Sequence, residues 1–144
     1  MDFINWIAII VAALMPSVVG FLWYGKVFMK AWVESTGKPA EYFQEANMAV
    51  VHGVSLLMSI ILSFALKVFI ETTHGGHLNC EGCGSFHTFQ HGFLHGVMYT
   101  GFFIIPTFMI NGLFERRGMK NTWIHIGYWL LTGGMMGGIL DAWV

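Results

Sequence analysis

The chain has 144 residues, of which 56% are hydrophobic and only 10% are charged. This composition lies outside the range of soluble globular domains and predicts an integral membrane protein. The formal net charge of −1 and the lack of a basic stripe exclude nucleic acid as a partner.

Four long apolar stretches, separated by short polar breaks, occupy most of the sequence. They are residues 3–24, 46–70, 89–114 and 122–144. A bilayer core about 30 Å thick is crossed by about 20 helical residues, so each stretch is long enough to span it. We therefore expect an all-α polytopic membrane protein, a single domain over residues 1–144 with four transmembrane helices in a bundle.

The charged residues between these stretches predict the orientation of the chain. Six of the seven Lys and Arg residues lie in the first and third breaks, namely Lys26, Lys30, Lys38, Arg116, Arg117 and Lys120. Under the positive-inside rule, these two breaks face the cytoplasm. Both termini and the loop at 71–88 then face outward. The first stretch lacks the basic start and the cleavage site of a signal peptide, so we expect it to be retained as a span.

The first span and the segment after it show two local patterns. Small or kinking residues share one flank of the span and predict close helix contact there: Ala12, Pro16 and Gly20. Residues 26–35 have the pattern of an amphipathic helix on the membrane surface, with Val27, Phe28 and Trp32 inserted into the bilayer. Gly37 is expected to end this helix.

The second span contains a polar stripe, whose members fall within about 120° of one another on a helix. They are His52, Ser55, Ser59, Ser63 and Lys67. The stripe has two interpretations. It lines a polar path between spans or copies, or it forms hydrogen bonds between helices, which is the commoner role of such residues.

The outward loop and the start of the third span contain a cluster of cysteines and histidines. Cys80 and Cys83 have the spacing of a thiolate pair, and His87 and His91 lie on one face of a helix. Two sulfurs and two imidazole nitrogens suit a tetrahedral zinc ion, and copper is the alternative metal. The sequence contains three further candidate ligands: His74, His77 and His95.

A Cys80–Cys83 disulfide is the competing interpretation, because an outward loop faces an oxidising compartment. The histidines would then be ordinary polar residues at the membrane surface. Only three residues separate the cysteine pair from the histidine pair, which is short for a four-ligand site. The choice between a metal site and a disulfide stays open at the level of sequence.

The third and fourth spans contain small residues at helical spacing. Gly133, Gly134, Gly137 and Gly138 form two overlapping G-x-x-x-G patterns. This pattern predicts a close helix contact, either within one chain or between copies. The carboxylates Glu115 and Asp141 lie at span ends, so no acid is expected at the midplane. That absence argues against a proton-coupled cation exporter.

Several short motifs resemble a known family. Asn5-Trp6 opens the first span, Trp23-Tyr24 closes it, and Asn111 to Glu115 ends the third span. With Trp32 and Tyr128, these motifs resemble the bacterial integral membrane proteins grouped as domain of unknown function 1761. The resemblance implies a four-span fold in the bacterial cytoplasmic (inner) membrane and no established activity. The loop from His74 to His91 departs from the family pattern, so a metal role would belong to this protein alone.

No catalytic or nucleotide-binding motif is present, so we expect a protein that is not an enzyme. Three functions fit. The first is a structural or accessory subunit that associates with itself or with another membrane protein. This function requires the fewest features beyond those that the sequence shows. The second is a small oligomeric channel or transporter. The third is extracytoplasmic binding of zinc or copper through the Cys/His loop.

Overall fold

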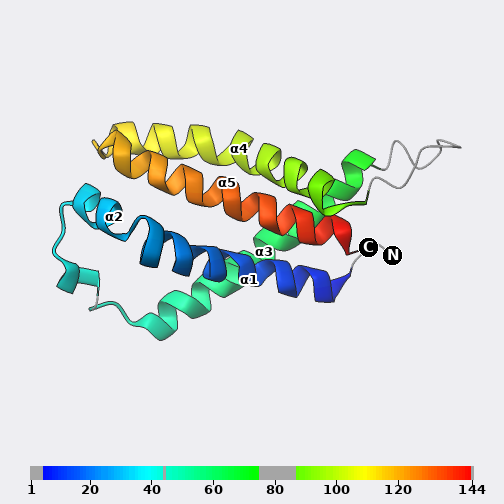
Figure 1. Cartoon of the computed structure of the whole chain (residues 1–144), viewed down its shortest axis with the longest axis horizontal. Coiled ribbons are helices and arrows are strands. Elements are labelled where there is room, and N and C mark those ends of the chain that lie inside the picture. The colour runs from blue at the N-terminus through cyan, green and yellow to red at the C-terminus, as the bar shows by residue number, and fades with distance from the viewer. Residues whose placement is uncertain (1–4, 44, 75–86, 144) are drawn as a thin grey trace, which may run out of the picture.

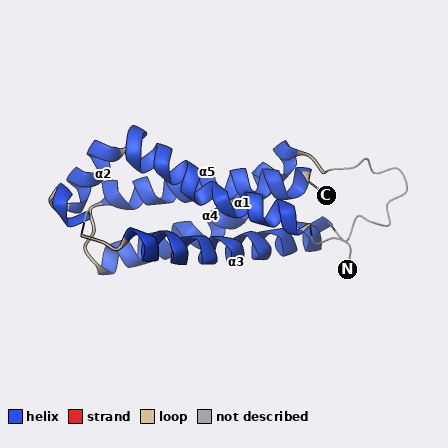
Figure 2. Cartoon of the chain, turned by 90° about the horizontal axis from the view of Figure 1, so that it is seen from below, coloured by secondary structure: helices blue, strands red, loops and turns tan. Residues whose placement is uncertain are grey.

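The computed structural model describes residues 5–43, 45–74 and 87–143, which contain helices and no strand (Figures 1 and 2). The elements are α1 (Trp6–Leu22), a π-helical turn (Trp23–Val27), α2 (Met29–Thr36), a 3-10 turn (Ala40–Phe43), α3 (Met48–His74), α4 (Phe89–Phe114) and α5 (Met119–Ala142). The side chain of Asn5 caps α1 by accepting from the N–H groups of Ile7 and Ala8.

Two helix boundaries show how the sequence determines the ends of the spans. Helix α4 has the predicted bounds, 89–114. Helix α3 continues to His74 instead of ending at residue 70, so the loop begins later than predicted. Glu71 follows Lys67 by one helical turn, and their side chains pair at 2.6 Å. This contact favours continuation of the helix.

Helix α5 lies at the centre of the bundle. It runs antiparallel to α4 along the whole length of both helices, and it also packs against α1 and α3 (Figure 1).

The two described ends of the chain, Asn5 and Trp143, meet through a hydrogen bond from the Asn5 amide to the Trp143 carbonyl. We call this end of the bundle the terminal end. The opposite end, which holds α2 and the turn between α4 and α5, is the basic end (Figure 1).

The apolar core occupies the terminal half of the bundle, where α1, α3 and α5 meet. Its buried residues are Ala8, Ile9, Ala12, Leu66, Ile70, Met136 and Leu140. The alanines of α1 allow close approach of the neighbouring helices, as the small-residue flank predicted. Toward the basic end α3 diverges, and every residue from 48 to 58 is exposed.

Aromatic side chains join α1 and the π-helical turn after it to α5, nearer the basic end. The indole N–H of Trp23 donates to the Ile124 carbonyl at 3.1 Å. The Tyr24 hydroxyl lies 2.7 Å from Nδ1 of His125. The Tyr128 hydroxyl donates to a carbonyl of α1 at 2.8 Å. These contacts satisfy the polar ends of large rings that would otherwise be buried without partners.

Helix α2 forms and ends at Gly37, which adopts a left-handed conformation with φ 67°. The prediction that Trp32 points into the bilayer was wrong. Its ring lies 5.3 Å from that of Tyr24 and 4.7 Å from that of Phe43, between centroids. Packing against these two tilted rings turns Trp32 toward the protein.

Three helical segments are long and apolar enough to cross a membrane: Trp6–Val27, Met48–Thr73 and Phe89–Phe114. They indicate a multi-pass membrane protein. The predicted fourth span, α5, does not meet this criterion. It contains Lys120 and Asp141 together with polar and glycine residues, which lower its apolar content.

Candidate functional site

Glycines bring α4 and α5 into contact at the terminal end. A Cβ atom on Gly96 would overlap the carbonyl group of Gly133, and one on Gly92 would overlap the carbonyl of Gly137. Only glycine permits backbones to approach this closely. The G-x-x-x-G pattern therefore makes a contact within one chain, which the sequence left undecided.

Asp141 follows Gly137 by one helical turn and so faces α4. Its side chain is fully buried. Its Oδ1 lies 3.1 Å from Nδ1 of His87, and its Oδ2 lies 3.0 Å from Nδ1 of His91. A carboxylate accepts hydrogen bonds, so each ring donates when its proton is on Nδ1. One buried acid thus orients two histidines, which stay 30% and 28% exposed.

His95 extends this arrangement along α4. Its Nε2 lies 3.2 Å from Nε2 of His91, one helical turn earlier. The centroid of the His95 ring lies 5.7 Å from that of Tyr99, whose hydroxyl contacts Thr73 of α3. We refer to His87, His91, His95 and Asp141 as the histidine–aspartate cluster.

A buried cation lies beside this cluster. Lys67 is 1% exposed, and its Nζ donates to the Leu140 carbonyl at 3.0 Å while pairing with Glu71. Leu140 immediately precedes Asp141 near the C-terminal end of α5. A positive charge is favourable there, because the unpaired carbonyls of a helix C-terminus carry partial negative charge.

The structure brings together three of the predicted metal ligands, His87, His91 and His95. It does not test the set of Cys80, Cys83, His87 and His91. His77 and both cysteines lie outside the described residues, as does the side chain of His74, which ends α3. Among the described residues, no three His, Cys, Asp or Glu side chains are arranged to hold a metal ion.

Sequence reasoning missed Asp141, which was assigned only to a span end. The sequence nevertheless indicates that Asp141 faces another helix, because it continues the four-residue spacing of Gly133 and Gly137. A residue on the contact flank of a glycine-rich helix faces the partner helix. Glu71 was missed in the same way, although it stands one turn after Lys67 in the polar stripe.

The polar stripe of α3 divides into two parts. Ser63 is buried and donates to the Ile9 carbonyl of α1 at 2.9 Å, which makes it an interhelical contact. Ser55 and Ser59 line a cavity of about 400 Å³ between α1, α3 and α5. Ser59 donates within its own helix to the Ser55 carbonyl, and His52 is exposed. The described part of the stripe therefore mixes packing contacts with cavity lining.

Comparison with known proteins gives one match. Residues 7–141 match the family described as "Protein of unknown function (DUF1761)". No curated protein and no solved structure matches the chain. The matched region includes the aromatic contacts between α1 and α5, the glycine contact and Asp141. The match confirms the resemblance that the short motifs indicated.

Proposed function

Because the chain belongs to the DUF1761 family, whose description names no activity, we propose a function from the geometry of the cluster. The protein is a four-span, non-enzymatic membrane protein that binds zinc or copper at the histidine–aspartate cluster. The observation that supports this proposal best is the separation of 3.2 Å between the Nε2 atoms of His91 and His95.

The packing of α5 supports a fourth span. It lies beside α4 from end to end, so a membrane crossed by α4 is also crossed by α5 (Figures 1 and 2). Its polar side chains at Thr132 and Asp141 are fully buried. A central helix is covered by protein instead of lipid, which removes the need for a continuous apolar surface. An even number of spans places both termini on one side.

The distribution of charge supports the proposed orientation. All six basic residues of the two predicted cytoplasmic breaks lie at the basic end, in or next to α2 and the turn before α5. The cluster would then face outward at the surface of the bacterial cytoplasmic membrane. In intact cells, an impermeant thiol reagent should label reduced Cys80 and spare a cysteine placed at Lys38. The reverse pattern would contradict this orientation.

The spacing of the two imidazoles suits a tetrahedral ion. Zinc–nitrogen bonds of about 2.0–2.1 Å at a tetrahedral angle separate two nitrogens by about 3.3 Å. The Nε2 atoms of His91 and His95 lie 3.2 Å apart. Asp141 accepts from Nδ1 of His91, and this second-sphere carboxylate favours the tautomer whose Nε2 lone pair binds metal. Imidazole nitrogen suits zinc and copper alike.

Two nitrogens complete half of a tetrahedral site. The other two positions are open to water or to the cysteine pair predicted from the sequence. We expect Cys80 and Cys83 to raise the affinity if they are reduced thiols. A disulfide between them would leave a weaker site made of histidines and water.

Metal analysis of protein purified without a histidine tag tests the proposal. We expect the wild type to retain zinc or copper after dialysis, and the His91→Ala/His95→Ala variant to bind at least tenfold more weakly. His52→Ala is the matched control, since this histidine is exposed on α3. Equal metal content in the wild type and the double variant would refute the metal function.

Self-association, as expected of a structural or accessory subunit, is a second candidate. The exposed half of α3 presents His52, and Ser55 at the rim of the cavity between α1, α3 and α5, on a surface that would otherwise contact lipid. A second copy would cover these polar groups. In a Cys80→Ser/Cys83→Ser background, Gly53→Cys should give crosslinked dimers in membranes, because the space around Gly53 is open. Leu113→Cys on α4 is the control, and equal crosslinking at both positions would argue against a specific interface.

A further inference from the structure

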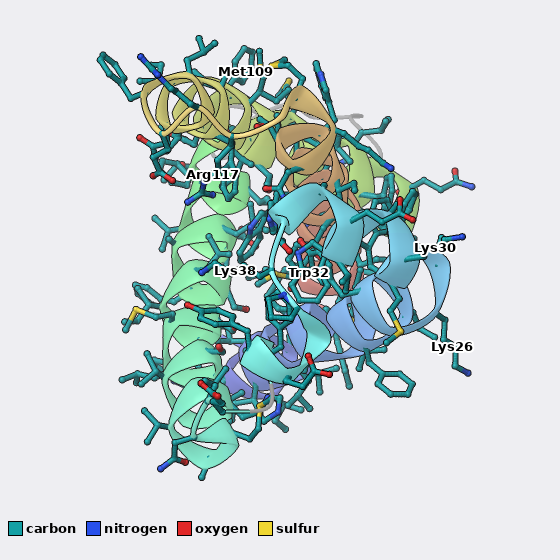
Figure 3. The ribbon with its side chains drawn as sticks, turned by 90° about the vertical axis from the view of Figure 1, so that its left-hand side faces the viewer. Lys26, Lys30, Trp32, Lys38, Met109 and Arg117 are labelled. Carbon is teal, nitrogen blue, oxygen red and sulfur yellow. The ribbon has the colours of Figure 1, made fainter. Side chains whose placement is uncertain are left out.

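A cavity of about 550 Å³ lies at the basic end, between α2, the 3-10 turn and the beginning of α5. Its lining includes two aromatic residues, three cations and one acid: Trp32, Phe43, Lys38, Arg116, Arg117 and Glu115. Figure 3 shows Lys38 and Arg117 on the same side of Trp32, whereas Lys26 and Lys30 project from the opposite side of the molecule. The basic residues of this end therefore form two groups, of which one lines the cavity.

The cavity has an excess of positive charge. Glu115 pairs with Arg117 at 2.5 Å, so its carboxylate offsets one of the three cations. The ammonium group of Lys38 lies 3.7 Å from the ring centroid of Tyr42. Gly118, which also lines the cavity, precedes α5 and provides no side-chain cap for it. The first N–H groups of a helix add further positive potential.

Arg116 has a backbone conformation that normally selects glycine. Its φ is 53°, in the left-handed region. The N–H of Arg117 donates to the Gly112 carbonyl at 2.8 Å and that of Arg116 to the Leu113 carbonyl at 3.2 Å, which is the hydrogen-bond pattern of a Schellman cap. A long cationic residue is strained at this position, and such strain is concentrated at functional sites.

We propose that this cavity binds an organic phosphate anion that has an apolar part. The cations would bind the phosphate, since guanidinium groups match its oxygen geometry. The half-buried rings of Trp32 and Phe43 would contact the apolar part. The nearest source of this chemistry is the headgroup of an anionic phospholipid, because basic pockets at the cytoplasmic surface face such lipids. A soluble phosphate ester is the other source.

The test compares lipid binding by purified variants. Binding of phosphatidylglycerol and of phosphatidylcholine is measured by native mass spectrometry in detergent, with and without inorganic phosphate. We expect the wild type to prefer phosphatidylglycerol, and Arg116→Gly and Lys38→Ala each to weaken that binding about fivefold. Lys26→Ala is the matched control, a cation at the same end that lies outside the cavity.

Arg116→Gly separates binding from folding, because glycine relieves the left-handed strain and should not lower the melting temperature. Lipid binding that inorganic phosphate leaves unchanged would support a phospholipid. Phosphate binding or competition that Arg116→Gly weakens would support a soluble phosphate ester. The proposal is overturned if Arg116→Gly and Lys38→Ala bind phosphatidylglycerol as tightly as the Lys26→Ala control and phosphate does not bind.

Discussion

The ammonium group of Lys67 lies 3.0 Å from the carbonyl oxygen of Leu140, a residue 73 positions later in the sequence. This contact joins α3 to the C-terminal end of α5, directly before the acid that orients His87 and His91. The buried lysine is therefore part of the structure that holds the histidine–aspartate cluster in place. The four predictions that follow test this relationship, the glycine contact, the role of Asp141 and the contact between α1 and α5.

Replacing the buried lysine should destabilise the protein. Lys67→Met leaves Glu71 without its partner, and the Leu140 carbonyl loses its donor. Removing one member of a buried ion pair costs about 3 kcal/mol or more. The expected value lies near this lower figure, because the Glu71 side chain keeps 21% exposure. Unfolding in mild detergent measures the change. The double variant Lys67→Met/Glu71→Leu should recover most of the loss, and failure to recover would show that the pair itself is not responsible.

The glycine contact gives the second prediction. Gly96→Ala places a methyl group against the backbone of Gly133 and Gly137, so α4 and α5 must separate. Overpacking of this kind costs about 1–3 kcal/mol. Gly53→Ala is the matched control, since no atom lies within 4 Å of its Cβ position. That variant should gain about 0.5–1 kcal/mol, because alanine favours a helix over glycine. Thermal unfolding of both variants measures the change in stability. Equal changes in Gly96→Ala and Gly53→Ala would contradict the close contact between α4 and α5.

The features that the sequence predicted follow from local requirements. The apolar length of a span is set by the bilayer, so the bounds of α4 could be predicted from composition. Close backbone contact requires residues without side chains, so Gly133 and Gly137 could be identified as contact residues. The termination of α2 at Gly37 also depends only on local conformation. Each of these features can be predicted without knowing which helix is the partner.

The features that it did not predict depend on which elements meet. The glycine pattern does not identify its partner, so the burial of Asp141 against His87 could not be inferred from spacing alone. The direction of Trp32 depends on rings contributed by Tyr24 and Phe43, which lie on other segments. The left-handed conformation of Arg116 contradicts the preference of its residue type. Tertiary contacts decide the first two, whereas Arg116 is held in its conformation by the backbone hydrogen bonds of the Schellman cap.

Asp141 should control metal affinity without binding the metal directly. Asp141→Asn keeps the shape of the side chain but replaces one acceptor oxygen with an N–H donor, so one of the two histidines loses its acceptor. Loss of such a second-sphere partner weakens metal binding about 10–100-fold. Zinc titration of the apo protein measures the change. Glu115→Gln, an exposed acid at the basic end, should bind zinc like the wild type. Unchanged affinity in Asp141→Asn would remove the acid from the proposed site.

The contact between α1 and α5 gives the last prediction. The Tyr128 hydroxyl donates to the Pro16 carbonyl at 2.8 Å, in a buried position between the two helices. Tyr128→Phe removes the donor, keeps the ring and leaves the carbonyl without this partner. We expect a loss of about 1–2 kcal/mol, measured by unfolding in detergent. Tyr42→Phe is the matched control, because that ring is 50% exposed and should change the stability little. If both variants unfold at the wild-type temperature, the hydrogen bond to Pro16 does not stabilise the packing of α1 on α5.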